Sequence, residues 1–264
     1  MLRCRAGDRL PLDEDLLVEG DNLPALAALP AGAFDMAYLD PPFNTGAPRR
    51  RGALGYADAF GDYPAFLLPR LERVRELLAP HGTLYLHLDY REAHRVKLAL
   101  DDLFGPECFL NELIWAYDYG GKPRGRWPAK HDTILVYVRD RERYHFDDAE
   151  VDREPYMAPG LVGPEKAARG KRPTDVWFHT IVPTNSREKT GYPTQKPEGI
   201  VRRMVAASSR PGGWCLDPFA GSGTLGAVCA KLGRRFVLID SNPAAVAISA
   251  ARLADPHRAA GGIA

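Results

Sequence analysis

Short apolar runs alternate with longer segments of helical periodicity along most of this 264-residue chain. A short apolar run bounded by Gly, Pro or Asp is typical of a buried strand, whereas apolar residues three and four positions apart indicate an amphipathic helix. Strands are predicted at 16–19, 34–39, 83–88, 109–115, 133–138, 214–219 and 234–240. Helices are predicted at 64–78, 92–104, 198–208, 224–232 and 242–253. This succession indicates an α/β domain.

A glycine-rich turn follows the predicted strand at 214–219. Gly221 and Gly223 let the backbone bend sharply and approach a ligand, because no Cβ stands in the way. A helix and a second strand come next, and that strand ends in Asp240, an acid suited to binding ribose hydroxyls. The unit has the order of a nucleotide-binding βαβ motif, although a tight turn in an ordinary α/β protein stays an alternative. The absence of a Gly-Lys-Ser/Thr run argues against a P-loop.

A second candidate site follows the strand at 34–39, where the chain reads Asp40-Pro41-Pro42-Phe43. Open α/β sheets bind ligands at the carboxyl ends of their strands, which is where Asp40 lies. A carboxylate beside a carbonyl held by proline offers two acceptors, and these match the two N–H donors of an amino group. Phe43 offers a flat face on which a base can stack. The alternative is a proline-rich turn with a capping Asp.

Both motifs resemble those of the amino DNA methyltransferases with permuted motif order, called class beta. Thr194-Gln195-Lys196-Pro197 and Gly20-Asp21-Asn22-Leu23 fit the same family, and the resemblance runs from about residue 18 to 253. It implies an α/β fold of the circularly permuted, Rossmann-like methyltransferase type with an inserted target-recognition region. It also implies S-adenosylmethionine as the cofactor, and Asp40, Pro41, Pro42 and Phe43 as the catalytic residues. The cofactor-binding residues implied are Asp21, Asn22, Lys196, Pro197, Asp217, Phe219, Gly221, Ser222, Gly223, Thr224 and Asp240.

The permuted order has a physical meaning. The carboxyl-terminal unit stops after the strand at 234–240 and one helix, and the sheet needs a further strand on that side. We expect residues 16–19 to supply that strand from the other end of the chain, since chain ends that lie close together tolerate such a rearrangement. Asp21 then lies beside Asp240, near the adenine end of the cofactor. Lys196 is expected to meet the cofactor carboxylate.

The chain is expected to divide into three parts. Residues 1–115 form the catalytic half of the methyltransferase domain, and residues 192–264 form the cofactor-binding half. Residues 116–191 are the target-recognition insertion, which includes a core strand at 132–139, because Pro, Gly and charges are dense there and periodicity is weak.

Clusters of cations without intervening acids suit contacts with DNA phosphates. The candidate DNA-binding residues are Arg49, Arg50, Arg51, Lys122, Arg124, Arg126 and Lys130. Four more cations lie between Lys166 and Arg172. Solvated surface loops are the alternative. The formal net charge is only +1, so DNA binding would depend on a local basic face.

Several classes of protein are disfavoured. The four cysteines have no metal-ligand or disulfide spacing, and no metal is assigned. His87 falls in a predicted strand and is expected to be part of the core rather than catalytic. No apolar run reaches membrane length and the charged N-terminus does not resemble a signal peptide, so we expect a cytoplasmic protein.

The sequence therefore predicts a site-specific methyltransferase that acts on an exocyclic amine of double-stranded DNA after base flipping. Adenine N6 is favoured, because the family's adenine members usually carry Asp first in this motif and its cytosine-N4 members more often Ser. Three alternatives stay open: a cytosine-N4 enzyme, a catalytically silent module that binds cofactor and DNA, and methylation of RNA or protein. A homodimer and an accompanying restriction enzyme are partners that the sequence leaves open.

Overall fold

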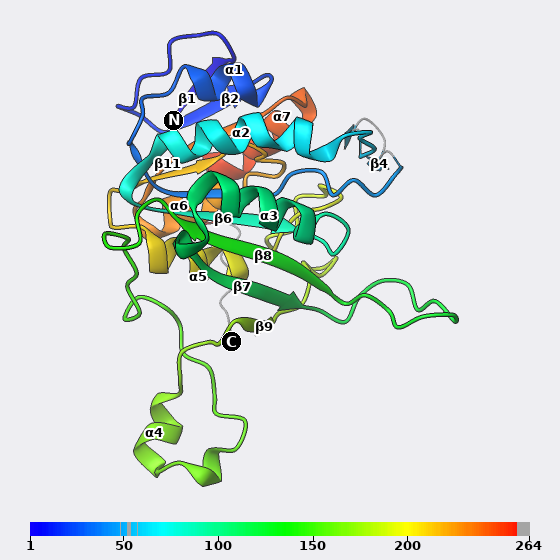
Figure 1. The fold of residues 1–264 in the computed structure, drawn as a ribbon, viewed down its shortest axis with the longest axis vertical. Coiled ribbons are helices and arrows are strands. Elements are labelled where there is room, and N and C mark those ends of the chain that lie inside the picture. Colours follow the sequence, from blue (N-terminus) through cyan, green and yellow to red (C-terminus); the bar gives the residue numbers. More distant parts are fainter. Residues whose placement is uncertain (48, 52–53, 57, 258–264) are drawn as a thin grey trace.

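The protein is built around one large mixed sheet, whose face is toward the viewer in Figure 1. The computed structural model describes the backbone of residues 1–47, 49–51, 54–56 and 58–257. Within these ranges the strands of the sheet are β1 (Leu2–Arg5), β2 (Leu16–Glu19), β3 (Phe34–Leu39), β6 (Leu78–Leu88), β7 (Phe109–Ala116), β8 (His131–Val138), β9 (Val176–Phe178), β10 (Trp214–Asp217) and β11 (Arg235–Asp240). Their spatial order is β1-β2-β11-β10-β3-β6-β8-β7-β9. Neighbouring strands are parallel except that β8 is antiparallel to β6 and to β7. A separate hairpin joins β4 (Arg49–Arg51) to β5 (Leu54–Tyr56).

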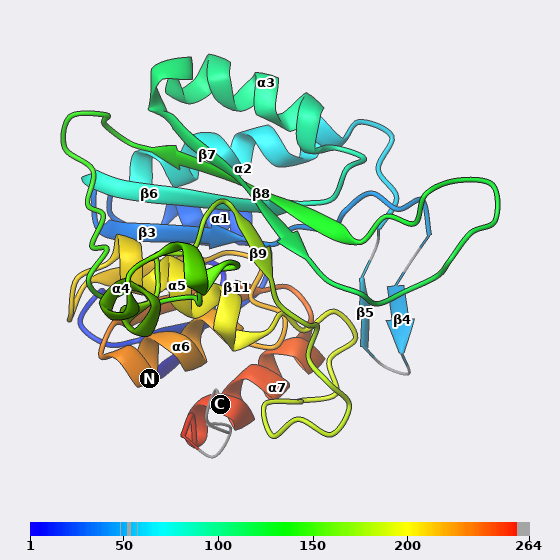
Figure 2. The same cartoon turned by 90° about the horizontal axis from the view of Figure 1, so that it is seen from below.

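Helices cover both faces of the sheet and give a three-layer architecture (Figures 1 and 2). The helices are α1 (Asn22–Ala27), α2 (Tyr63–Leu77), α3 (Ala93–Phe104), α4 (Pro164–Arg169), α5 (Glu198–Ser208), α6 (Thr224–Leu232) and α7 (Pro243–Ala254), with 3-10 turns at Pro106–Cys108 and Pro159–Leu161. Apolar residues of α1, α2 and α3 share one buried cluster with one face of the strands. Those of α5, α6 and α7 form a second cluster on the other face. Burial on both faces explains why the central strands are almost continuously apolar.

The two ends of the chain meet in the sheet, as the permuted order predicts. β2 pairs in parallel with β11, and Glu19 lies opposite Asp240. The Gly20 N–H donates to the Asp240 carbonyl at 3.0 Å. β1 then extends the sheet beyond β2. The strand at 16–19 is therefore supplied from the amino-terminal end, and the permuted fold class is confirmed.

Because β8 runs antiparallel to β6 and β7, the two long connections within residues 116–191 leave the sheet at opposite edges. Residues 117–130 join β7 to β8 and extend from the edge at which the parallel strands end (Figure 2). Residues 148–175, here called the arm, leave from the opposite edge and carry α4 (Figures 1 and 2). The core strand expected at 132–139 is β8, which lies inside the sheet. The boundaries of the target-recognition region at 116 and 191 stay a prediction.

Each predicted element lies within two residues of its observed bounds, except the strand predicted at 83–88. The strand predicted to reach Phe219 ends at Asp217, where the chain turns at Pro218. β6 begins at Leu78 rather than at Thr83, and its pairing with β3 shifts register between Phe34 and Met36. β1, β9 and the β4–β5 hairpin were not predicted from the sequence. They are three or four residues long, too short for a periodic signal.

Among the helices that the structure describes, none combines the length and the apolar character needed to cross a bilayer. The cytoplasmic location stays a prediction.

Candidate active site

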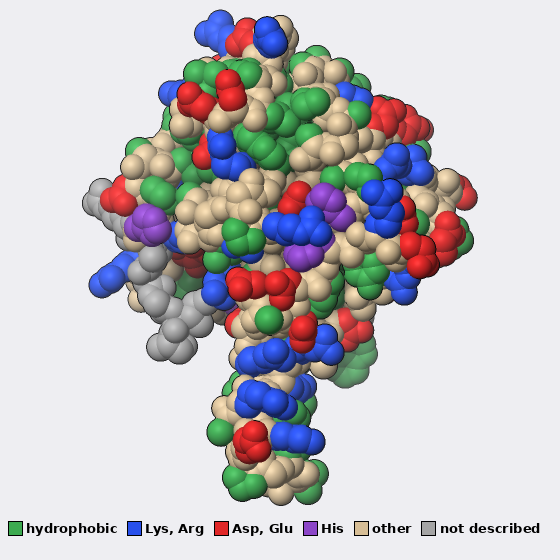
Figure 3. Space-filling view, turned by 90° about the vertical axis from the view of Figure 1, so that its left-hand side faces the viewer, with side chains coloured by type: hydrophobic (Ala, Val, Ile, Leu, Met, Phe, Trp, Pro, Cys, Tyr) green, Lys and Arg blue, Asp and Glu red, His purple; other side chains and the backbone are tan. Residues whose placement is uncertain are grey.

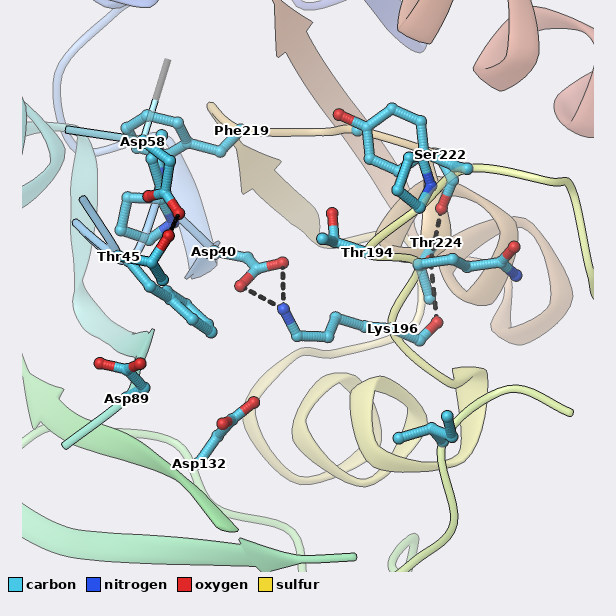
Figure 4. Close-up of a pocket in the computed structure, with 18 of the residues that line it drawn as sticks. Asp40, Thr45, Asp58, Asp89, Asp132, Thr194, Lys196, Phe219, Ser222 and Thr224 are labelled. Carbon is cyan, nitrogen blue, oxygen red and sulfur yellow. Dashed lines mark hydrogen bonds and ion pairs between the residues drawn. The ribbon is translucent and has the colours of Figure 1, made fainter. Parts of the chain in front are cut away.

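A cavity of about 1390 Å³ opens at the edge where the parallel strands end. Its walls come from the turns after β3, β6, β10 and β11, from the start of β8 and from the segment 189–196 (Figure 4). The structure thus brings the turn after Asp40 and the turn after Asp217 into one cavity, although they are far apart in the sequence. The predicted site residues that line it are Asp21, Asn22, Asp40, Pro41, Pro42, Phe43, Lys122, Arg126, Lys196, Asp217, Phe219, Gly221, Ser222, Thr224 and Asp240.

The turn that carries Asp40 is held firmly by its surroundings. The Tyr63 hydroxyl donates to the Pro42 carbonyl at 2.7 Å. Asn44 adopts a left-handed conformation with φ 55°, and its amide donates to Glu92 at 2.7 Å and accepts from the Phe60 N–H at 2.8 Å. These bonds fix the path of the chain on both sides of the motif. The Asp40 carboxylate points into the cavity (Figure 4).

Lys196 lies directly against Asp40. Its Nζ is 2.6 Å from each carboxylate oxygen, and it lies 4.8 Å from the centre of the Phe43 ring. The two side chains are only 10% and 17% exposed, so water screens this ion pair weakly. From the sequence, Lys196 is expected to meet the cofactor carboxylate. In the structure, its partner is the predicted catalytic acid.

His87, Asp132 and Tyr38 form a hydrogen-bonded chain of buried side chains next to Phe43. His87 is fully buried, and its ring centre lies 5.8 Å from that of Phe43. Its Nε2 lies 3.1 Å from Asp132, and its Nδ1 lies 2.9 Å from the Tyr38 hydroxyl. Burial raises the pKa of Asp132, but the interactions with His87, Lys196 and Tyr117 together lower it on balance. An ionised carboxylate can only accept, so Nε2 is the donor to Asp132, and Nδ1 shares a hydrogen bond with the Tyr38 hydroxyl. His87 is a core residue, as expected.

The glycine turn after β10 is organised by two buried acids. Asp217 accepts from the Phe219 N–H at 2.9 Å. Asp240 accepts from the Gly221 N–H at 2.7 Å and from the Asn242 N–H at 2.8 Å. Burial raises the pKa of both carboxyls, and the nearby charges of Asp40 and Asp240 raise that of Asp217 further. Both oxygens of Asp240 hold the backbone, so this acid shapes the turn as well as lining the cavity.

Asn22 and Arg70 link the amino-terminal strand to the glycine turn. The Asn22 amide donates to the Pro218 carbonyl at 2.8 Å and accepts from Arg70 Nε at 2.6 Å. The Arg70 guanidinium also stacks on Phe66, at 4.2 Å from its ring centre. Sequence reasoning missed Arg70 and Phe66, which line the cavity, because a cation on a helix is usually solvated. It also missed Tyr192, whose ring covers Gly221.

The predicted site residues Gly223, Pro197 and Lys130 do not line the cavity. Gly223 does not line the cavity: a Cβ there would lie 2.8 Å from the Ser249 hydroxyl of α7, so this glycine permits close packing of the turn against a helix. Pro197 lies outside the cavity as the N-cap of α5. Lys130 donates to the carbonyls of Tyr119 and Gly120 at 2.8 and 2.9 Å, which braces the loop 117–130 from within.

The remaining predicted DNA-binding residues lie in two places. Lys122, Arg124 and Arg126 are exposed on the loop 117–130, and Arg126 donates to the Tyr90 hydroxyl at 3.3 Å. Arg49, Arg50 and Arg51 form β4, but their side chains lie outside the described part of the structure. The cations between Lys166 and Arg172 lie on the arm, where Figure 3 shows Lys and Arg side chains gathered, and none of them lines the cavity.

The cavity suits a ligand that carries several charged and polar groups, because acids and cations both line it. Asp21, Asp40, Asp217 and Asp240 all line it, and the turn at Gly221 brings backbone close to the space. Among the described residues, no group of three His, Cys, Asp or Glu side chains is arranged to hold a metal ion. The residues present therefore fit a sulfonium cofactor such as S-adenosylmethionine.

Comparison with protein families shows the family to which this chain belongs. A family model for DNA methylases of the N6/N4 type matches residues 34–251, which is most of the chain and includes both motifs. The chain belongs to this DNA methylase family. The resemblance inferred from the sequence is thereby confirmed.

Relatives of this DNA methylase support the assignment. The chain is 32% identical over 240 residues to the type II methyltransferase M.HpaI of Haemophilus parainfluenzae, and the match covers 90% of this chain and 73% of the relative. It is 29% identical over 247 residues to the DNA adenine methyltransferase YhdJ of Escherichia coli, and that match covers 90% of this chain and 82% of the relative.

Solved structures share the fold of this DNA methylase. The PvuII cytosine-N4-specific DNA methyltransferase superposes with a TM-score of 0.68 at 17% identity and covers 93% of both chains. A complex of M1.HpyAVI with S-adenosylmethionine gives 0.62 at 21% identity, covering 90% of this chain and 98% of its own. A modification methylase of Thermus thermophilus bound to the same cofactor gives 0.60 at 21% identity, covering 99% and 98%.

The packing role of Gly223 generates a prediction. Gly223 and Gly212 both have a left-handed φ, 71° and 76°, but a Cβ meets Ser249 only at Gly223 and meets nothing within 4 Å at Gly212. Both alanine variants carry the backbone strain, and Gly223→Ala adds overpacking, which costs about 1–3 kcal/mol. We expect Gly223→Ala to lower the free energy of unfolding by that much more than Gly212→Ala, in urea denaturation without cofactor. An equal decrease in the free energy of unfolding for both variants would contradict the packing role of Gly223 and leave it with a role in ligand binding alone.

Proposed function

We propose that this DNA methylase transfers a methyl group from S-adenosylmethionine to the exocyclic N6 of adenine in double-stranded DNA. The observation that carries the proposal is that Asp40, Phe43 and the glycine turn at Gly221 line one and the same cavity. One side of the cavity suits an amino group on a flat ring. The other suits a nucleoside cofactor.

Asp40 and Pro41 supply the chemistry that the amine needs. The nitrogen of an aromatic amine is a poor nucleophile, because its lone pair is delocalised into the ring. When its two N–H groups donate to the Asp40 carboxylate and the Pro41 carbonyl, the nitrogen becomes pyramidal and its lone pair is directed outward. The cofactor supplies an activated methyl group on a sulfonium. Most of the acceleration then comes from positioning and electrostatics, without a covalent intermediate on the protein.

The cofactor is expected to lie along the turns after β10, β11 and β2. Gly221, Ser222 and Thr224 are assigned to its methionine end, with Phe219 beside it. Asp240 is assigned to the ribose, and Asp21 to the region near the adenine. Arg70 and Phe66 join this set, because they line the cavity beside Asp21 and Asn22.

The target base has to leave the duplex, since a stacked base cannot reach a carboxylate inside a cavity. Phe43 would stack on the flipped base, and the chain of His87, Asp132 and Tyr38 would hold Phe43 in place. Lys122, Arg124 and Arg126 extend from the same edge of the sheet as the cavity and are assigned to phosphates. The homodimer and the restriction enzyme stay predictions.

Adenine is favoured over cytosine because the motif opens with Asp40, as in the family's adenine members, and because the relative YhdJ is a DNA adenine methyltransferase. A cytosine-N4 enzyme is the second candidate, since the PvuII enzyme has the same fold and both bases offer the same two donors. Sequencing the genomic DNA of a host that expresses the protein, with detection of modified bases, reports base and site together. Nucleoside mass spectrometry then tests the base directly. We expect N6-methyladenine; N4-methylcytosine as sole product would overturn the base assignment and leave the roles of Asp40 and Pro41 standing.

Asp40 is predicted to be essential for methyl transfer and dispensable for cofactor binding. Asp40→Ala removes an acceptor that acts on the base, which is expected to lower kcat about a hundredfold or more. Single-turnover methylation of the mapped site measures this loss, and calorimetry with S-adenosylhomocysteine checks that the cofactor still binds. Glu72→Ala, which removes an exposed acid of α2, is the control. A near wild-type rate in Asp40→Ala would refute the assignment.

The loop 117–130 is predicted to contact the DNA backbone. Replacing Lys122, Arg124 and Arg126 together by Gln should weaken binding on every sequence alike and flatten the salt dependence by about three units of slope. The matched control replaces Lys166, Arg169 and Arg172, three exposed cations of the arm at the opposite edge. Fluorescence anisotropy of a labelled duplex at several salt concentrations gives both slopes. Equal slopes for the two triple variants would contradict the assignment.

A further inference from the structure

The ammonium of Lys196 lies where the amino group of the target base is expected to bind. Its Nζ contacts both Asp40 oxygens at 2.6 Å and lies over the Phe43 ring at 4.8 Å. These are the acceptor and the stacking face that the proposed function assigns to the base. We propose that Lys196 closes the base site in the absence of cofactor, and that cofactor binding opens it by drawing Lys196 away from Asp40.

The base and the ammonium compete for Asp40, because Nζ already contacts both carboxylate oxygens at 2.6 Å. Two nitrogen atoms cannot both lie at hydrogen-bond distance in the same direction from one carboxylate oxygen without clashing. The competition also favours the lysine, because the ammonium brings a full opposite charge to the carboxylate, whereas the amino group of the base is neutral. The pair is largely shielded from water, so an incoming neutral amine gains little help from solvent in separating the two charges.

The backbone of Lys196 is tethered beside the glycine turn. Its carbonyl accepts from the Thr224 hydroxyl at 3.2 Å, at the first residue of α6 (Figure 4). The lysine therefore pivots from a point next to the turn assigned to the methionine end of the cofactor, and its flexible stem can carry the ammonium between two partners. Two further acids that interact with Lys196 are Asp132 and Asp217, which are already engaged by His87 and by the Phe219 N–H.

A carboxylate that arrives with the cofactor gives Lys196 a second partner. Releasing Asp40 and the face of Phe43 in this way couples the two binding sites, and the coupling is reciprocal by thermodynamic necessity. Cofactor binding should favour entry of the flipped base, and removal of the Asp40 charge should favour cofactor binding. This inference rests on the proposed function, because it takes the base site and the cofactor site from it.

Calorimetry of S-adenosylhomocysteine binding tests the coupling. This ligand is chosen because its thioether is neutral, so any direct attraction between Asp40 and a sulfonium does not enter. Asp40→Asn should bind it about fivefold more tightly than wild type, since Lys196 is released. Lys196→Met should bind it more weakly, and adding Asp40→Asn to Lys196→Met should then change nothing. Lys189→Met, which removes another lysine of the cavity wall, is the control.

Unchanged or weaker binding by Asp40→Asn in the wild-type background, or an equal effect in both backgrounds, would overturn the inference while leaving the proposed function intact. Failure of every form of the protein to bind S-adenosylhomocysteine would instead refute the proposed function.

A second measurement follows the base itself. In a duplex that carries 2-aminopurine at the mapped target position, fluorescence rises when the base leaves the stack. For wild type we expect this rise only when S-adenosylhomocysteine is present. Lys196→Met should give the rise without it, because nothing then covers Asp40 and Phe43. A rise in wild type that is independent of the ligand would overturn the inference.

Discussion

The parallel pairing of β2 with β11 is the constraint on which the cavity depends. It joins the amino-terminal strand to the last strand of the chain, with Leu16 opposite Val237 and Glu19 opposite Asp240. This pairing places Asp21 and Asn22, which directly follow β2, near the turn after β10. The bond from Asn22 to the Pro218 carbonyl, across 196 positions of sequence, is the direct consequence of that pairing. One edge of the sheet therefore collects groups from both ends and the middle of the chain.

The sequence was sufficient for those parts of the site that local chemistry determines. A strand that ends in Asp40 or Asp217 and runs into Pro or Gly can be recognised from a few residues, because backbone direction and burial are both set locally. The cofactor predicted from these residues agrees with the S-adenosylmethionine complexes among the structural neighbours. The strand at 16–19 was recognised by a different argument, since the sheet lacked a partner for the strand at 234–240.

The rest depends on tertiary packing that no local pattern encodes. Gly223 and Gly221 look equivalent in the sequence, yet one faces Ser249 of α7 and the other faces Tyr192. Lys130 is a cation like Lys122, Arg124 and Arg126 on the loop 117–130, but its ammonium donates hydrogen bonds to two carbonyls of that same loop. Lys196 was assigned to the cofactor, whereas its ion pair with Asp40 spans 156 positions and appears only in three dimensions.

The reversal of a single strand has a consequence for how such a protein can diversify. Because β8 runs against its neighbours, the connection from β7 opens over the cavity, while the longer excursion before β9 opens at the far edge. Each connection begins and ends on a hydrogen-bonded strand, so its length and composition can change without moving Asp40 or the glycine turn. The region predicted to recognise the target and the residues proposed for the chemistry thereby lie on separately replaceable parts, which would let a lineage change its recognition sequence while keeping its reaction centre.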